Sequence, residues 1–357
     1  MVRRAVVAAV AVGATVVSGL GAAAPAEAAS AKHPRVLPVS ASDDYLVYRQ
    51  KTASVAGLYL TKRSTLYWIG RSGGRHLLTD FDPELFPTVQ GSTVTQSARP
   101  NSIFDPDHDP ALPEHVRWRD LRTGAHGTTE LPASDDYAGA APGGWVAKRD
   151  VGAAAGAHLV RWSTTGAVTD LGVPIPGSSL FTASSGPKGV LVSAQNDVDV
   201  DSTGLIRYMP YAPPGRWRTV YAAGAGHDAT CGRPTSSVVV CDVHSHGKHS
   251  GEVLLSLTTS RRVWMSDHRT VCPTTAFVAV GSSAVGKDTT DLGPCVRSRL
   301  TKVGLTGKVT HSRVRWGLHG SGITAGLGRI LLDSPDQRRI VRLASVRSTP
   351  HTVVTAR

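Results

Sequence analysis

The feature that most constrains the fold is a hairpin pattern that recurs about every 45 residues along the chain. In its clearest copy, His158–Gly172, alternate residues set Leu159, Arg161 and Ser163 on one face against Val160 and Trp162 on the other; the pattern breaks at Thr164–Gly166 and resumes through Val168 and Leu171. Alternation on both sides of a tight turn predicts two short β-strands joined as a hairpin. One hairpin cannot bury its apolar face alone, so the repetition predicts several copies packed around a shared core.

Each copy has a strand centred on an aromatic or large aliphatic residue, with one strand before it and another after the turn. The seven central residues are Trp68, Trp118, Trp162, Tyr208, Leu255, Leu300 and Leu343, and their spacing is 43–50 residues. Strand-only repeats of this length are typical of propeller blades, whereas a β-sandwich shows shorter and less even spacing. We therefore expect an all-β fold with a single β-propeller of seven four-stranded blades, or six if the second or sixth repeat is misread.

A fourth strand for each blade is expected in the segment that precedes each first-named strand. Leu180–Ala183 and Thr230–Gly232 are two examples. A propeller usually closes its ring by letting strands from both chain ends share one blade, which removes an exposed sheet edge. We therefore expect Arg35–Val39 to lie beside Thr352–Val354.

The first repeat also carries a family-like pattern in Ser42–Tyr48, Leu66–Ile69 and Gly73–Thr79. This pattern resembles a blade of the TolB-like, WD40-related propellers, and the other repeats resemble that family only in their general arrangement. The sequence departs from the family at Ala41–Asp44, where those proteins often have Ser-Pro-Asp-Gly. The resemblance implies the propeller fold. It implies no particular partner, because propellers serve both as binding scaffolds and as enzymes.

The N-terminus has the features of a secretory signal peptide. Arg3 and Arg4 precede an uncharged, largely apolar run, which ends in the small-residue cleavage pattern Ala26–Ala28. We expect cleavage after Ala28, which divides the chain into a signal peptide at 1–28 and a propeller domain at 29–357. No later run is long and apolar enough for a transmembrane span. The sequence thus predicts a secreted, extracellular protein.

The chain is strongly basic, with a formal net charge of +12. A basic extracellular protein is attracted to polyanions, so the expected partners are an anionic cell-wall polymer, a glycan or an extracellular protein. The arginines are scattered through every repeat and form no compact cluster. This distribution predicts no specific nucleic-acid binding.

All four cysteines lie in the second half of the chain, and a secreted location favours disulfides. Of the three possible connectivities we favour Cys231 with Cys241 and Cys272 with Cys295, because each pair then stays within one repeat. A structural zinc site is the weaker alternative, because the usual Cys-x₂-Cys spacing is absent.

The most site-like segment for a metal alternates three aspartates before a glycine. Asp197, Asp199 and Asp201 are hard oxygen ligands, and Gly204 permits a sharp turn, so calcium is the cofactor that this segment suggests. The closing glutamate of an EF-hand is missing, and an ordinary polar loop between strands is the alternative interpretation. No other cofactor is indicated.

Two further segments interrupt the repeat. Asp105–Pro110 is a proline-stiffened acidic loop, and its composition is equally typical of an exposed turn. His244, His246 and His249 form a histidine cluster that suits zinc or copper, although a solvated hairpin loop explains it as well. The recurrent tryptophans are expected in the packing between strands rather than in a carbohydrate-binding site.

No catalytic motif stands out. The chain has no Gly-x-Ser-x-Gly elbow, and only four glutamates follow the signal peptide. We therefore predict no catalytic residues and a secreted, non-enzymatic β-propeller that acts as a binding or scaffold module for an extracellular or cell-wall ligand. The alternative is an extracellular polysaccharide-acting hydrolase or lyase that uses aspartates at the channel mouth.

Overall fold

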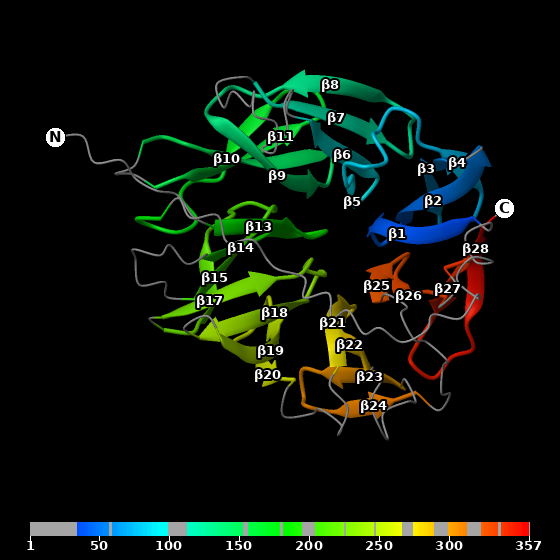
Figure 1. The fold of residues 1–357 in the computed structure, drawn as a ribbon. Coiled ribbons are helices and arrows are strands. Elements are labelled where there is room, and N and C mark those ends of the chain that lie inside the picture. Colours follow the sequence, from blue (N-terminus) through cyan, green and yellow to red (C-terminus); the bar gives the residue numbers. More distant parts are fainter. Residues whose placement is uncertain are drawn as a thin grey trace.

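The computed structural model describes residues 34–56, 59–98, 113–152, 156–178, 181–194, 204–224, 226–245, 248–265, 274–288, 299–312, 323–334 and 337–356. These residues form seven four-stranded antiparallel sheets, which are arranged as the blades of a propeller (Figure 1). None of the described residues lies in a helix. Accordingly, this part of the chain contains no helix that could cross a membrane.

Four consecutive strands make each blade. The first four blades are formed by β1 (Arg35–Ala41), β2 (Tyr45–Ala56), β3 (Tyr59–Gly70) and β4 (Arg75–Leu77); β5 (Thr88–Gln90), β6 (Thr93–Ala98), β7 (His115–Asp120) and β8 (His126–Glu130); β9 (Asp135–Ala141), β10 (Gly144–Arg149), β11 (His158–Ser163) and β12 (Val168–Asp170); β13 (Phe181–Ser185), β14 (Gly189–Ala194), β15 (Leu205–Pro210) and β16 (Arg218–Ala222).

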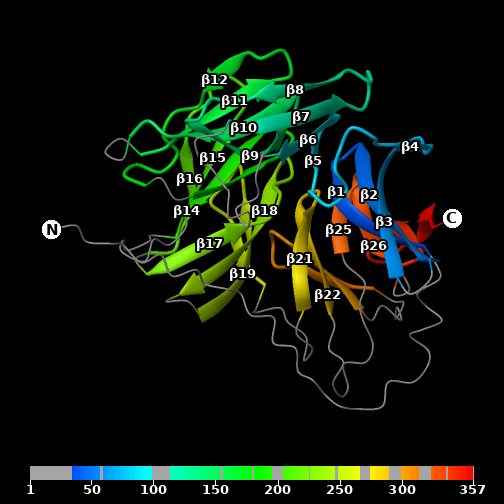
Figure 2. The ribbon, with the colours of Figure 1, turned by 45° about the horizontal axis from the view of Figure 1, so that its top comes forward.

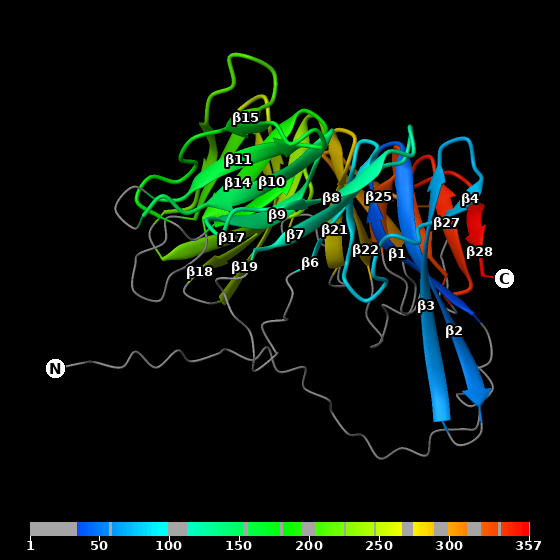
Figure 3. The same cartoon turned by 90° about the horizontal axis from the view of Figure 1, so that it is seen from above.

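The remaining three blades follow the same order. They are formed by β17 (His227–Cys231), β18 (Val238–Ser245), β19 (Lys248–Ser256) and β20 (Arg262–Trp264); β21 (Thr274–Val280), β22 (Ser283–Asp288), β23 (Arg299–Gly304) and β24 (Val309–His311); β25 (Ile323–Gly326), β26 (Arg329–Asp333), β27 (Arg339–Leu343) and β28 (His351–Thr355). Figure 2 shows that the first strands of the blades, among them β1, β21 and β25, stand around the centre of the ring. In blade 1, β2 and β3 have 12 residues each and extend beyond the ring as a long hairpin (Figure 3).

The residue that recurs in the sequence lies in the third strand of every blade. All seven central residues, from Trp68 in β3 to Leu343 in β27, lie in third strands. The two expected first strands around Leu180–Ala183 and Thr230–Gly232 correspond to β13 and β17. The prediction of a seven-bladed all-β propeller is therefore confirmed.

The second strands explain why apolar residues run consecutively rather than alternate. In β18, Val239 packs into a cluster shared with blade 4, whereas Val238 and Val240 pack into a cluster shared with blade 6. Both faces of such a strand are buried between neighbouring blades, so neither face can be polar. Burying an aliphatic side chain of this size contributes about 1.5–3 kcal/mol, which makes these clusters the main support of the ring.

The described tryptophans contribute to this packing, as expected. Trp145 is fully buried and Trp162 nearly so, and their rings stack with centroids 6.1 Å apart. The indole nitrogen of Trp162 donates a 3.1 Å hydrogen bond to Asp135, whose carboxylate also accepts two 2.7 Å bonds from Arg149. Trp162 is thus a structural residue of blade 3.

Hydrogen bonds between the turns of neighbouring blades reinforce the ring. The Ser42 hydroxyl donates to the Gly91 carbonyl at 2.7 Å, which links blade 1 to blade 2. The Thr235 hydroxyl donates to the Gly281 carbonyl at the same distance, which links blade 5 to blade 6. In both cases the turn after the first strand of one blade is fixed to the corresponding turn of the next.

The ring closes by the same kind of contact and not by a shared blade. The β1 strand pairs with β2 and β28 pairs with β27, so the expected pairing of Arg35–Val39 with Thr352–Val354 is wrong. Instead, Leu327 N–H donates to the Ser42 carbonyl at 2.7 Å, and Val36 N–H donates to the Gln337 carbonyl at 2.6 Å. An apolar cluster across blades 7 and 1, which includes Val36, Leu46, Leu331 and Ile340, supplies the burial that a shared blade would otherwise provide.

Candidate ligand-binding pocket at the centre of the ring

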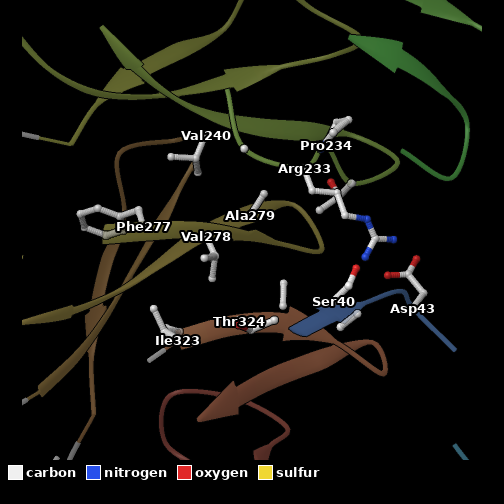
Figure 4. Close-up of a pocket in the computed structure, with 14 residues that line it drawn as sticks. Ser40, Asp43, Arg233, Pro234, Val240, Phe277, Val278, Ala279, Ile323 and Thr324 are labelled. Carbon is white, nitrogen blue, oxygen red and sulfur yellow. The ribbon is translucent and has the colours of Figure 1, made fainter. Parts of the chain in front are cut away.

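A pocket of about 200 Å³ lies where the first strands of four blades converge. We call it the central pocket (Figure 4). Its lining comes from blade 1 (Ser40, Ala41, Asp43), blade 5 (Gly232, Arg233, Pro234, Thr235, Val240), blade 6 (Phe277, Val278, Ala279) and blade 7 (Ile323, Thr324, Ala325). Small residues at the strand ends leave this space open, while Val240 and Phe277 close its sides as part of the buried cluster between blades 5 and 6.

The one arginine in the described lining is Arg233. Its guanidinium points across the pocket toward Ser40 and Asp43 of blade 1 (Figure 4). The Arg233 Nε is buried and has no hydrogen-bond partner among the described residues. Burial lowers the pKa of the Arg233 guanidinium below its usual value, and the charge of Asp43 partly offsets that effect. An arginine keeps its proton despite such a shift, so the pocket contains a positive charge that lacks a complete set of acceptors.

A disulfide holds the loop that carries Arg233. Cys231 and Cys241 face each other across β17 and β18 and are bonded, which confirms the first of the two expected pairs. Inside the loop, Gly232 N–H donates to the Val240 carbonyl at 2.9 Å, and Thr235 N–H donates to the Val238 carbonyl at 2.9 Å. The backbone on both sides of Arg233 is therefore fixed. Cys272 and Cys295 lie outside the described residues.

The segment that carries Asp43 is fixed by local hydrogen bonds. The Ser42 hydroxyl accepts a 3.1 Å bond from Tyr45 N–H, a turn that serine side chains commonly stabilise. Arg71 donates from Nε to the Asp43 carbonyl at 2.9 Å, and the same nitrogen lies 3.1 Å from a carboxylate oxygen of Asp44. Asp43 is an exposed residue and lines the central pocket.

A second hollow lies beside this turn, and we call it the blade 1–2 groove. It has a volume of about 720 Å³ and is lined by side chains that include Tyr45, Trp68, Arg71, His76 and Arg122. The His76 ring stacks on Trp68 at 4.2 Å between centroids, and the Tyr45 ring meets Trp68 edge to face at 5.6 Å. The aromatic groups of this groove are thus packed against each other.

The metal sites suggested by the sequence are not tested by the structure. Asp197, Asp199 and Asp201, the loop Asp105–Pro110 and His246 all lie outside the described residues. His244 is described: its Nε2 lies 3.5 Å from an Asp242 carboxylate oxygen, and its backbone pairs with that of His249 across β18 and β19. Within the described ranges, no three histidine, cysteine, aspartate or glutamate side chains come together as a metal site would require.

Sequence reasoning missed both charged residues of the central pocket. Arg233 is one of 39 basic residues, and nothing in its immediate sequence shows that its side chain turns toward the ring axis. A signal did exist in its position, because Arg233 lies between two cysteines that join neighbouring strands. Asp43 lies in the segment that departs from the Ser-Pro-Asp-Gly of the TolB-like pattern.

Solved structures share the fold. One of two prolyl endopeptidases analysed for the role of inter-domain dynamics in catalysis and specificity matches with a TM-score of 0.55 at 15% identity, over 91% of this chain and 50% of that chain. The acylaminoacyl peptidase of Pyrococcus horikoshii matches with a TM-score of 0.54 at 10% identity, over 91% of this chain and 53% of that chain. This chain therefore spans about half the length of either peptidase.

The β-propeller domain of the Trilobed protease from Pyrococcus furiosus is similar over nearly its full length. Its TM-score is 0.55 at 7% identity, with coverage of 91% of this chain and 97% of that chain, and it has an open velcro topology. These similarities establish the propeller fold. No protein-family model and no curated protein matches the sequence, so membership of the TolB-like or WD40-related propellers stays a prediction.

Proposed function

We propose that this protein is a secreted, non-enzymatic β-propeller that acts as a binding or scaffold module, and that it holds an extracellular or cell-wall ligand in the central pocket. The observation that carries the proposal is a pocket built from four blades that combines mostly apolar walls with one arginine, Arg233, whose Nε is buried without a partner among the described residues. Apolar walls with a few placed polar groups are the usual composition of small-molecule sites. The Cys231–Cys241 bond and the signal-like N-terminus both support an extracellular location.

The alternative of a polysaccharide-acting hydrolase or lyase has less support at this pocket. Glycoside hydrolysis generally uses two carboxyl groups that flank one bond. Asp43 is the one carboxylate among the described lining residues of the central pocket. The similar peptidases do not favour catalysis here either, because about half of each peptidase lies outside the similarity.

A ligand screen with a blocked pocket tests the proposal. Thermal shift measurements on the protein would use a panel of glycans, cell-wall fragments and small extracellular metabolites. Thr324→Trp fills the pocket from β25, and Ser72→Trp adds the same bulk in the exposed blade 1–2 groove as a matched control. We expect a ligand that raises the Tm of the wild type and of Ser72→Trp and leaves Thr324→Trp unshifted.

Three outcomes would contradict the proposal. Equal shifts for Thr324→Trp and the wild type would place the ligand outside the central pocket. A panel without any stabilising compound would count against a binding role for this pocket. Release of cleaved products from a panel glycan, followed by chromatography, would show that the protein is an enzyme.

A further inference from the structure

The central pocket contains a cation whose donors are not all used. Arginine presents five N–H donors in a planar fork, and the Nε of Arg233 is buried without an acceptor among the described residues. Other arginines of the ring are better satisfied: Arg149 makes two 2.7 Å bonds to Asp135, and Arg161 donates a 2.6 Å bond to the Pro142 carbonyl. A buried donor without an acceptor is costly, and the unpartnered Nε shows that the described residues leave part of the hydrogen-bonding capacity of Arg233 unused.

Arg49 is the other described arginine with buried nitrogens that have no partner, and it differs from Arg233 in its surroundings. Its guanidinium lies over the Phe86 ring at 5.1 Å and pairs with Glu84 at 3.4 Å. Arg49 is not part of the described lining of the central pocket. Arg233 therefore combines an incomplete set of hydrogen bonds with a space that can admit a ligand.

The size and walls of the pocket restrict that ligand. At about 200 Å³ it is smaller than the roughly 300–1,000 Å³ typical of sites for drug-sized molecules, so the ligand is small. Val240, Phe277 and Ile323 offer apolar surface, which suits a hydrocarbon or aromatic body. The ligand thus needs an acceptor group at one end and an apolar portion at the other.

The charge balance selects the acceptor group. One guanidinium with a carboxylate near it favours a monoanion, because Asp43 repels a second negative charge. A carboxylate matches the fork of the guanidinium with two parallel hydrogen bonds. Resting on the proposed function, we infer that the central pocket binds a small monocarboxylate, whose carboxylate pairs with Arg233 and whose apolar portion lies against Val240, Phe277 and Ile323.

Titration calorimetry with matched compounds tests this inference. The compounds are 3-phenylpropionate, its neutral amide 3-phenylpropanamide, and phenyl phosphate as a dianion. Arg233→Met removes the charge while keeping an apolar chain of similar length, and Arg122→Met makes the same change in the blade 1–2 groove. We expect the wild type and Arg122→Met to bind the acid about tenfold to a hundredfold more tightly than the amide, and Arg233→Met to bind the two about equally.

Asp43→Asn provides a second variant that does not disturb the buried side of the pocket. It removes the carboxylate that competes for Arg233, so we expect the affinity for 3-phenylpropionate to rise severalfold. An unchanged or weaker affinity would mean that Asp43 and Arg233 form a structural pair across the ring, and the inference would be wrong.

The remaining outcomes distinguish an error in the ligand class from an error in the binding site. If the acid and the amide bind equally and Thr324→Trp blocks both, the pocket is a binding site and the carboxylate inference fails. If Thr324→Trp blocks neither compound, the proposed function fails as well. Tighter binding of phenyl phosphate than of the acid, or no heat of binding up to about 10 mM acid, would also overturn the inference.

Discussion

Asp43 and Asp44 are neighbours in the chain, but Asp43 lines the central pocket and Asp44 lines the blade 1–2 groove. A comparison of the two hollows shows which of them offers a ligand the stronger interaction. In the blade 1–2 groove, Asp44 pairs with Arg71 at 3.1 Å, and both side chains are more than half exposed. In the central pocket, Arg233 has a buried nitrogen without an acceptor among the described residues. A solvent-exposed ion pair contributes little free energy, whereas a guanidinium with an unpartnered buried nitrogen keeps a charge that a ligand in the pocket can pair with.

The two hollows also differ in how their walls are held. The central pocket is bounded by the Cys231–Cys241 loop and by the junction of blades 7 and 1, where the backbones approach closely. The blade 1–2 groove is bounded by turns and by exposed side chains such as His76 and Arg122. We therefore expect substitutions at the central pocket to change the free energy of unfolding more than substitutions at the groove.

The largest effect is expected on removing the disulfide. The cysteines are 10 residues apart, and in the chain-entropy description a loop of this size stabilises the folded state by about 2–3 kcal/mol. The double variant Cys231→Ser, Cys241→Ser should lose this amount in urea unfolding. It should also bind 3-phenylpropionate more weakly, because the Arg233 loop is no longer fixed. A loss below about 1 kcal/mol would show that the hydrogen bonds of the loop suffice to hold it.

An intermediate effect is expected at Gly326 in β25. A Cβ at this position would lie 2.3 Å from the Ala41 Cβ and 2.9 Å from a methyl carbon of Leu331. Gly326→Ala should therefore cost about 1–3 kcal/mol, as overpacking does in a close-packed core. Gly70→Ala in the groove is the matched control, because its Cβ would meet nothing nearer than 3.6 Å. If the two variants unfold at the same urea concentration, the wall of the central pocket is no more tightly packed than the wall of the blade 1–2 groove.

The smallest effect is expected at Arg71. Its side chain is 59% exposed, so the Arg71–Asp44 pair is screened by water and salt. Arg71→Gln should lower the free energy of unfolding by less than about 1 kcal/mol, and the difference should shrink at about 1 M salt. Unfolding curves at low and high salt measure this. A larger loss that persists at high salt would indicate that the bond from Arg71 to the Asp43 carbonyl supports the central pocket.

Much of the fold could be predicted because its signal is repeated and local. The recurring residue, for example Trp162 or Leu255, marks the same strand in each blade, and the disulfide between Cys231 and Cys241 follows from two strands joined by a short loop. The mode of closure could not be predicted in this way. Whether β1 pairs with β2 or with β28 depends on burial at the junction of blades 7 and 1, where residues far apart in the sequence meet.

The candidate site was harder to predict for a related reason. The sequence drew attention to segments that interrupt the repeat, whereas Arg233 and Asp43 lie within it, at the turns after first strands. The sequence does not show that these two turns, nearly 200 residues apart, face the same space. Only the curvature of the ring brings them together.

Each blade is complete within one contiguous stretch of sequence, and this has a consequence for how the protein is made. A propeller with a shared blade cannot finish its first sheet until the last residues of the chain arrive. In this protein β1 pairs with β2, and every blade consists of four consecutive strands, so each blade can form as soon as its own residues have been synthesised. The paired strands are close in sequence, so only short loops must close. This favours rapid folding, one blade at a time, while the chain is being synthesised. Only the docking of blade 7 on blade 1 must wait until β25–β28 have been made, and that step also completes the wall of the central pocket.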